Sequence, residues 1–361
     1  MRKDVPHLLV YISGHGFGHL AQVAPVLNSL FLQLPDLRLT ICSKVSSSVL
    51  QSRIQGVFTQ IDEAADFGMV MASALDVLPE PSMAAYREFH LDWSSRVAHE
   101  AERIMRLAPD FVLTNVAYLP LSAAQQAGIS CAAMCSLNWA DIFAAYCAAM
   151  PGAAEILQQI RQAYAAADNF IRITPAMPMQ DLANVCSVDP IARIGQNRRT
   201  QINARLGLNA SDKLILVSMG GIAMRLPIER WARVANVRWI VQADWGISHP
   251  DVVTLESLEM DFIDVLASSD MLLCKPGYGS FAEAACNGIP VLYVTREDWP
   301  EEPYLITWLE AQGLCRKVTR AQSDTGLFHE ALQNLLSLPK PLPVKPSGIA
   351  QATDYLIQRL L

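Results

Sequence analysis

Apolar and polar positions alternate in blocks along the first half of the chain, which predicts alternating strands and helices. Apolar runs of strand length stand at residues 7–13, 37–42, 57–61, 110–114 and 130–135. Between them, residues 20–32 and 82–107 carry apolar side chains at helical spacing, and a further helix is expected between the last two runs. This order predicts a parallel, doubly wound sheet with helices on both faces.

The second half repeats this order after a change of texture. Prolines punctuate residues 174–190, which lack clear periodicity and are interpreted as a linker. Apolar runs then return at residues 213–218, 237–241, 271–274 and 291–294. A proline-rich connector at 338–346, which cannot be helical, leads to an amphipathic segment. We therefore expect two Rossmann-like α/β domains, residues 1–175 and 191–340. A last helix, within 347–361, is expected to pack on the first of these domains.

Composition supports a large buried core and narrows the classes of partner. Hydrophobic residues make up 52% and charged residues 17% of the 361 positions, as expected for parallel strands covered on both faces. The net charge of −7 argues against a nucleic-acid partner, because binding to a phosphate backbone needs a basic surface. Mean hydropathy is +0.21. However, a proline, a glycine and amide side chains interrupt the long uncharged stretch at 111–140, so we expect no membrane span.

Signals for secretion and for metal binding are absent from the sequence. The first five residues are largely charged or polar, and the apolar run that follows is too short for a secretory signal. The eight cysteines include no Cys-x-x-Cys pair, so we interpret them as buried thiols of a reducing compartment. No Asp-x-Asp triplet is present to hold a divalent metal against a diphosphate. These features predict a cytoplasmic protein with no metal site and no bound cofactor.

The most informative segment is residues 270–305, where an apolar run leads through a glycine-rich turn into an alanine-rich helix. At such a junction, unpaired backbone N–H groups and the positive helix end face one point and make an anion site. Glu283 lies about one helical turn further in, within reach of a sugar hydroxyl beside a bound phosphate. A second glycine turn follows the strand at 213–218 and is either a wall of the same site or a simple tight turn. We expect these two turns to hold a nucleoside diphosphate through Lys275, Gly277, Tyr278, Gly279, Ser280, Gly220 and Gly221.

Another glycine-rich turn, GHGFGH at residues 14–19, follows the first strand. Its spacing fits a loose dinucleotide fingerprint and so admits a nicotinamide or flavin enzyme, but the second strand ends in Cys42 and Ser43 without the expected acid. A histidine at the carboxyl edge of a parallel sheet lies where ligands bind, and its pKa suits deprotonation of a hydroxyl. We expect His19 to be a general base, with His15 as its partner or substitute. The alternative is that these histidines only cap the helix or bind backbone carbonyls.

Further polar residues follow strands at the same edges. Glu301 and Glu302 come after the strand at 291–294, where they either bind sugar hydroxyls or occupy the first turn of a helix, which favours acids. In the first half of the chain, further candidates for binding a second substrate, the one with the reacting hydroxyl, come from the first turn and from the segment after the strand at 130–135: Gly16, Phe17, Gly18, Asn138 and Asp141.

Three segments carry a family resemblance: GHGFGH at 14–19, KPGYGSFAEAACNGIPVLYV at 275–294 and EEPYL at 301–305. They resemble the GT-B glycosyltransferases, and the similarity covers nearly the whole chain. The chain is similar to the glycosyltransferase-like domain fused to a sugar kinase in plant L-arabinokinases, and more distantly to the lipid II N-acetylglucosaminyltransferases. The resemblance implies two Rossmann-like domains facing a cleft. It places His19 near the reaction centre, residues 277–280 on the donor diphosphate, Glu283 on the ribose, the acids near Glu301 on the donor sugar, and residues 258–260 on the base.

Two positions depart from the related pattern. Gln22 stands where the arabinokinase-like domains have a basic residue, and Asn115 stands at a strand end where an acid is expected.

Taken together, the motifs and the resemblance predict a metal-independent, inverting glycosyltransferase. It would move a sugar from a nucleoside-diphosphate sugar, most simply a UDP-sugar, to a hydroxyl acceptor. The acceptor is a small molecule or is lipid-linked, which would bring peripheral membrane contact. The alternatives are a nucleotide-sugar epimerase or hydrolase on the same fold, and a non-catalytic nucleotide-sugar-binding module.

Overall fold

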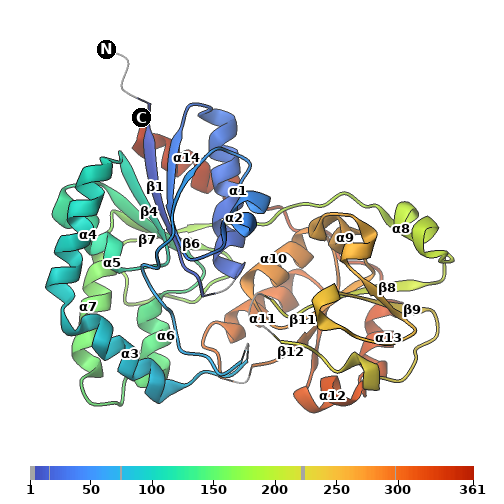
Figure 1. Cartoon of the computed structure of the whole chain (residues 1–361). Coiled ribbons are helices and arrows are strands. Elements are labelled where there is room, and N and C mark those ends of the chain that lie inside the picture. Colours follow the sequence, from blue (N-terminus) through green and yellow to red (C-terminus); the bar gives the residue numbers. More distant parts are fainter. Residues whose placement is uncertain (1–4, 16, 74, 221–223, 297) are drawn as a thin grey trace. The chain divides into compact units, whose positions relative to one another are not determined.

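The computed structural model describes residues 5–15, 17–73, 75–220, 224–296 and 298–361. Contacts along the chain divide it into two compact units, each with its own sheet (Figure 1). Unit 1 comprises Met1–Ala72, Asp76–Ile191 and Ser347–Leu361, and unit 2 comprises Ser73–Leu75 and Ala192–Pro346.

Unit 1 is built on a parallel sheet with the strand order β3-β2-β1-β4-β5-β6-β7. The strands β1, β4 and β5 are buried along their whole length, because helices cover both faces of the sheet. The strands of unit 1 are β1 (His7–Ile12), β2 (Arg38–Cys42), β3 (Thr59–Ile61), β4 (Phe111–Asn115), β5 (Cys131–Cys135), β6 (Asn169–Ile173) and β7 (Val185–Val188).

The helices of unit 1 pack on the two faces of this sheet, and Figure 1 shows α1 beside α14 on one flank, with α4 and α5 on the other. The last helix buries Ala352, Leu356 and Leu360, and its partner α1 comes from the other end of the chain. The helices are α1 (Phe17–Gln33), α2 (Ser47–Arg53), α3 (Pro79–Leu91), α4 (Trp93–Leu107), α5 (Leu119–Ala127), α6 (Trp139–Cys147), α7 (Ala153–Ala165) and α14 (Gly348–Leu360).

Unit 2 contains a second parallel sheet, with the order β10-β9-β8-β11-β12-β13. Part of its core is an aromatic cluster in which Trp231 lies edge-on to Trp239 and Phe328. The strands are β8 (Lys213–Ser218), β9 (Val237–Val241), β10 (Val252–Thr254), β11 (Met271–Cys274), β12 (Val291–Val294) and β13 (Cys315–Val318). The helices are α8 (Arg199–Leu206), α9 (Phe262–Ser268), α10 (Tyr278–Cys286), α11 (Glu302–Gln312), α12 (Arg320–Thr325) and α13 (His329–Ser337), with the short 3-10 turns η1 (Ile228–Arg230), η2 (Ala243–Trp245) and η3 (Glu256–Leu258).

Several local predictions were wrong or incomplete. The largely buried strand β6 was not predicted. The segment interpreted as a linker at 174–190 contains the edge strand β7, and the edge strands β10 and β13 of unit 2 were also missed. These strands are three or four residues long and partly exposed, so each gives little apolar signal. The helix expected at 82–107 is two helices, because the backbone leaves helical geometry at Asp92. A one-residue break does not disturb the periodicity of the apolar positions.

In each sheet, the chain adds strands first toward one edge and then toward the other, so the strand order reverses at one point. In unit 1 the chain moves from β1 toward β3 and then returns to β4 on the other side, and in unit 2 it moves from β8 toward β10 and returns to β11. Ile12 pairs with Asn115, and Ser218 pairs with Cys274, so the loops that follow these strands leave from neighbouring points. Ligands of open parallel sheets bind outside the carboxyl ends of the strands at such a switch point.

Across the described ranges, no helix combines the length and the apolar character that a bilayer crossing requires.

Candidate functional site

The turns after β8 and β11 meet at the switch point of unit 2. Gly220 has a φ of +84°, a conformation that L side chains rarely adopt. A Cβ built on Gly220 would lie 2.9 Å from Cε of Lys275, so the lysine side chain runs directly over this glycine. The positive φ therefore favours glycine at position 220, and a side chain there would also displace the end of Lys275.

The beginning of α10 is open. Gly277 occupies the N-cap, and a Cβ built on it would meet no described atom within 4 Å. Gly279 and Ser280 are half-buried in the first turn, whereas the side chain of Tyr278 is buried. The first amides of a helix have no acceptor within the helix, and the positive end of the helix dipole lies at this turn, beside the open space at Gly277.

Two cations stand beside this turn. Arg296 is buried, its guanidinium lies 4.5 Å from the ring centre of Trp299, and its Nη2 donates to the carbonyl of Pro276 over 3.2 Å. Burial, followed by the positive charge of Arg296, lowers the pKa of Lys275 to about 8, and the nearby Glu301 opposes this shift. The sequence analysis did not identify Arg296, because its only local signal is its position after a strand.

Glu301 and Glu302 are both buried at the beginning of α11. Glu302 accepts the backbone N–H of Arg296 over 3.0 Å and lies 3.8 Å from its Nε, and burial raises the pKa of Glu302. Glu301 accepts a hydrogen bond from Nε1 of Trp299 over 3.2 Å. Glu301 is therefore the N-cap and Glu302 the first residue of α11, and both hold neighbouring groups in place. A role of either acid in binding the donor sugar stays a prediction.

Glu283 is buried in α10 and has a cationic partner. Arg193 Nε donates to Glu283 Oε1 over 3.2 Å, and the carbonyl of Arg193 accepts from Asn287 one turn further along α10. Arg193 therefore fixes the position of this carboxylate from a segment distant in the sequence. Ribose binding by Glu283 stays a prediction, and Arg193 carried no signal in the sequence analysis.

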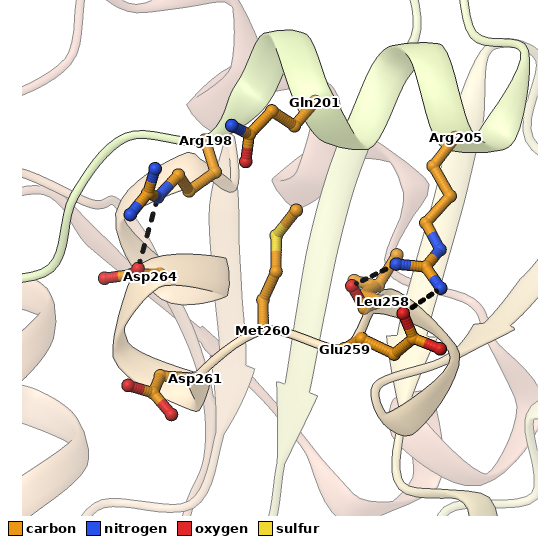
Figure 2. A pocket seen from close by; sticks show the side chains of 8 residues that line it. All are labelled: Arg198, Gln201, Arg205, Leu258, Glu259, Met260, Asp261 and Asp264. Atoms are coloured by element: carbon orange, nitrogen blue, oxygen red, sulfur yellow. Dashed lines mark hydrogen bonds and ion pairs between the residues drawn. The ribbon is translucent and has the colours of Figure 1, made fainter.

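The loop after β10, which the family resemblance associates with the base, lines a pocket of about 640 Å³ (Figure 2). Arg205 from α8 donates to the carbonyl of Leu258 over 2.9 Å and pairs with Glu259. Figure 2 shows Met260 extending between α8 and α9. The lining residues are Arg198, Gln201, Arg205, Leu258, Glu259, Met260, Asp261 and Asp264. Base binding here stays a prediction.

At the switch point of unit 1, His19 lies at the beginning of α1 and is buried. Its Nδ1 is 2.7 Å from Oδ1 of Asn115, the last residue of β4. Asn115 in turn donates to Gln22 Oε1 over 2.9 Å. Burial lowers the pKa of His19 to about 4, and the hydrogen bond to Asn115 opposes this shift.

His15 and His19 both contact Trp139, with ring centres 5.3 Å and 5.9 Å away. Nε1 of Trp139 donates to Asp66 over 2.8 Å, and burial raises the pKa of Asp66 to about 6. A Cβ built on Gly68 would lie 2.6 Å from Nδ1 of His15, so this glycine allows the histidine to approach the backbone. Asp66 is a candidate that the sequence analysis missed, because nothing in its own segment marks it.

The remaining acceptor-side candidates are placed differently. Asn138 caps α6: its Oδ1 accepts the backbone N–H of Asp141 and its Nδ2 donates to the carboxylate, both over 2.8 Å. Gly18 is exposed, and a Cβ built there would meet no described atom within 4 Å. Gly16 and Gly221 lie outside the described residues, and Phe17 is described only as the first residue of α1. In the described part of the chain, no group of three or more His, Cys, Asp or Glu is placed to hold a metal ion.

The sequence and the fold were compared with those of known proteins. No protein-family model matches the chain. The chain is 28% identical over 340 residues to the L-arabinokinase of Arabidopsis thaliana, which covers 91% of this chain and 32% of that protein. It therefore spans about a third of the length of this relative.

Solved glycosyltransferase structures match the whole chain. The glycotransferase of kitacinnamycin has a TM-score of 0.67 at 15% identity, with 99% of this chain and 100% of that chain covered. The calicheamicin glycosyltransferase has a TM-score of 0.65 at 14% identity, with 100% and 99% covered. Arabidopsis thaliana UGT89C1 complexed with UDP has a TM-score of 0.59 at 13% identity, with 98% and 95% covered.

The chain has the GT-B fold. The predicted fold class of two doubly wound parallel α/β sheets is thereby confirmed. Within this GT-B chain, the predicted site residues gather into two groups. One group surrounds the beginning of α10 in unit 2 and includes Gly220, Lys275 and Gly277. The other group surrounds Trp139 in unit 1 and includes His15 and His19.

Proposed function

We propose that the chain transfers a sugar from a nucleoside-diphosphate sugar to a hydroxyl acceptor, with inversion and without a metal ion. The observation that carries this proposal is the open beginning of α10 at the switch point of unit 2. There, Gly277 is the N-cap with open space beside its Cα, and the neighbouring Lys275 lies over Gly220. Backbone donors at a helix end and a nearby positive charge are both favourable for binding a diphosphate.

Charge develops on the diphosphate when the bond between the sugar and the phosphate oxygen breaks. The electron pair of that bond stays on the phosphate oxygen, and the helix end together with Lys275 and Arg296 stabilises it. Fixed donors directed at developing charge usually supply the largest catalytic contribution. The two cations provide locally what a bound metal ion supplies in other transferases, which supports the proposed metal-independent reaction.

The acceptor hydroxyl forms the new bond to the sugar carbon and loses its proton. His19 is the proposed base, because it is the histidine at the carboxyl edge of unit 1 with a fixed partner on one ring nitrogen. A single displacement with attack opposite the departing diphosphate inverts the configuration of the sugar carbon. The acceptor is a small-molecule or lipid-linked hydroxyl in this proposal.

Two relatives support a nucleotide-sugar substrate. UGT89C1 was solved with UDP and a second glycosyltransferase, VinC, with dTDP, which favours a pyrimidine nucleoside diphosphate. The name of the third relative, L-arabinokinase, indicates that it acts on a sugar, and this chain matches only part of that protein.

A second candidate function is a nucleotide-sugar-binding module without catalysis. The observation that favours it is the amide partner of His19: Asn115 carries no charge, and the pKa of His19 is lowered to about 4. A histidine with this pKa is a weak base at neutral pH.

A binding screen followed by a turnover assay tests the proposal. We expect UDP, dTDP or their sugar derivatives to raise the melting temperature of the wild type, and Lys275→Met to abolish most of that shift. Lys340→Met is the control, because Lys340 is an exposed lysine of unit 2 whose Nζ also has a hydrogen-bond partner, the carbonyl of Ser269. If no nucleotide shifts the melting temperature, the proposed function is wrong.

The turnover assay then separates the alternatives. Donor consumed only with an acceptor supports transfer, whereas free sugar or an epimer from donor alone identifies the hydrolase or epimerase. Binding without any consumption of donor identifies the non-catalytic module.

A further inference from the structure

A line of buried, uncharged hydrogen-bonding groups extends from His19 into the interior of unit 1. Nδ1 of His19 faces Oδ1 of Asn115 at 2.7 Å, Nδ2 of Asn115 donates to Gln22 Oε1 over 2.9 Å, and Nε2 of Gln22 donates to Oγ of Ser136 over 2.8 Å. Asn115 and Ser136 are 0% exposed and Gln22 is 2% exposed. Water therefore does not compete for these groups.

Three elements hold this line. His19 and Gln22 lie three residues apart on one face of α1, Asn115 ends β4, and Ser136 follows β5. The backbone N–H of Ser13 also donates to the carbonyl of Asn115 over 2.7 Å, which fixes that residue against the end of β1. The amide groups consequently have little freedom to move away from the imidazole.

The direction of the hydrogen bonds determines which nitrogen of His19 carries the proton. In the arrangement above, each amide nitrogen faces an acceptor oxygen, so Oδ1 of Asn115 is the atom left to accept from His19. Nδ1 of His19 then carries the hydrogen, and Nε2 keeps its lone pair. If both amides were turned over, the line would run the other way and Nε2 would carry the hydrogen. The two arrangements therefore predict opposite tautomers.

The surroundings of His19 contain few charges. The thiol of Cys135 lies 3.8 Å from Nδ1, the ring of Trp139 lies on another side, and Asp66 is held on the indole nitrogen of that tryptophan. A neutral amide orients an imidazole without favouring its cation as a carboxylate would. The lowered pKa of His19 agrees with this setting.

We propose that Asn115, Gln22 and Ser136 are positioning residues that hold His19 as the neutral tautomer protonated on Nδ1, so that Nε2 is the proton-accepting atom. The tautomer of His19 does not depend on sugar transfer, whereas the role of Nε2 as acceptor of the substrate proton rests on the proposed function. With amide partners, the imidazole of His19 is a weaker base than it would be beside a carboxylate, but it stays neutral across the neutral pH range.

Nuclear magnetic resonance of protein labelled with ¹⁵N-histidine tests the tautomer without any substrate. We expect His19, assigned by comparison with His19→Gln, to show a protonated Nδ1 and an unprotonated Nε2, with no titration between about pH 5.5 and about pH 8.5. His90 is an internal reference, because Gln159 and Tyr118 hold both of its ring nitrogens. A protonated Nε2, or titration of His19 near its ordinary pKa, overturns the proposal.

Two variants distinguish positioning from mere packing. Gln22→Met keeps the volume but removes the amide that orients Asn115, so we expect a mixture of the two tautomers of His19 in a folded protein. Asn115→Asp places a carboxylate on Nδ1 and is expected to raise the pKa of His19 by roughly two units. Ser136 can accommodate this change, because its hydroxyl can donate to a reversed Gln22. An unchanged tautomer in Gln22→Met and an unchanged pKa in Asn115→Asp would show that these residues only fill space.

A kinetic readout applies once a donor and acceptor pair is known. We expect Gln22→Met to lower kcat severalfold while the affinity for the donor nucleotide stays within twofold, and Asn115→Asp to move the pH profile of kcat. If the tautomer is found as expected but no pair turns over, the proposed function fails and the positioning of His19 stands.

Discussion

At the scale of single residues, Lys275 connects pH with nucleotide binding. Its pKa in the free protein is lowered to about 8, and a bound diphosphate favours the protonated form. The affinity for UDP should therefore fall by roughly tenfold between about pH 7 and about pH 9, as the lysine loses its proton before binding. Isothermal calorimetry across this range measures the change.

The matched variants define the source of this pH dependence. Lys275→Met should bind UDP weakly at both pH values, and Lys275→Arg should bind with little pH dependence because its charge is permanent. Lys340→Met should behave as the wild type. Retention of the full pH dependence in Lys275→Met would assign it to another group.

Asp66 is a second residue whose titration is measurable. Burial raises its pKa from 3.8 to about 6, so the folded protein binds this proton more tightly than the unfolded chain does. The free energy of unfolding therefore falls as pH rises from about 4 to about 6, and it remains reduced above that range. Asp66→Asn keeps an oxygen for Trp139 and should stabilise the protein at pH 7.5 by up to about 3 kcal/mol, with little effect at pH 4.

Chemical denaturation at these two pH values tests the prediction for Asp66. An equal loss of stability at both values would mean that the carboxylate makes favourable contacts beyond its bond to Trp139. A buried acid that costs stability at neutral pH is a candidate for a functional role. The variant should therefore also be assayed for turnover.

At the scale of elements, the two glycine turns of unit 2 make different demands. Gly220→Ala adds a methyl group 2.9 Å from Lys275 at a φ of +84°, so we expect a loss of about 1–3 kcal/mol in stability together with weaker UDP binding. Gly277→Ala adds its methyl group in open space at an extended φ of −163°. Its cost in stability should be roughly 1 kcal/mol or less, yet the methyl group would stand where the diphosphate approaches the helix.

Urea unfolding and calorimetry with UDP on both variants separate these effects. Weaker binding in Gly277→Ala with nearly unchanged stability is the expected signature of a ligand site at the beginning of α10. Unchanged UDP binding in Gly277→Ala would place the diphosphate elsewhere.

At the scale of the whole molecule, the last helix belongs to the unit that contains the first strand. Leu356 is fully buried in α14, whereas Leu361 just beyond the helix is 66% exposed. Leu356→Ala should lower the free energy of unfolding of unit 1 by about 2–5 kcal/mol, whereas Leu361→Ala should leave it almost unchanged. Hydrogen exchange should report the loss in β1 and α1, while β8 and β11 keep their protection.

Equal loss of protection in both sheets would show that the two units unfold as one cooperative block. UDP affinity provides an independent measurement, because the proposed diphosphate site lies within unit 2. It should be the same in Leu356→Ala as in the wild type at temperatures where both are folded.

The sequence by itself determined the central strands, the glycine turns and the fold class. Continuous apolar runs such as that of β11 are local signals, and Gly277 stands directly after one of them. The edge strands β7, β10 and β13 were not predicted, because partly exposed strands of three or four residues lack such runs. Two strands depart from this rule: the half-exposed edge strand β3 lies in the predicted run at 57–61, whereas β6 was missed although Phe170, Ile171 and Ile173 are buried.

Only the tertiary structure decided the partners of the site residues. Asp66 and Trp139 are 73 positions apart, Arg193 and Glu283 are 90 apart, and His19 and Asn115 are 96 apart. The first and third pairs form because parallel strands bring distant loops to the same edge of a sheet, and the second forms because the segment before α8 packs against α10. No segment alone shows a trace of its partner. The physical reason is that burial and hydrogen bonding set the charge and tautomer of these groups, and both depend on neighbours that are distant in the sequence.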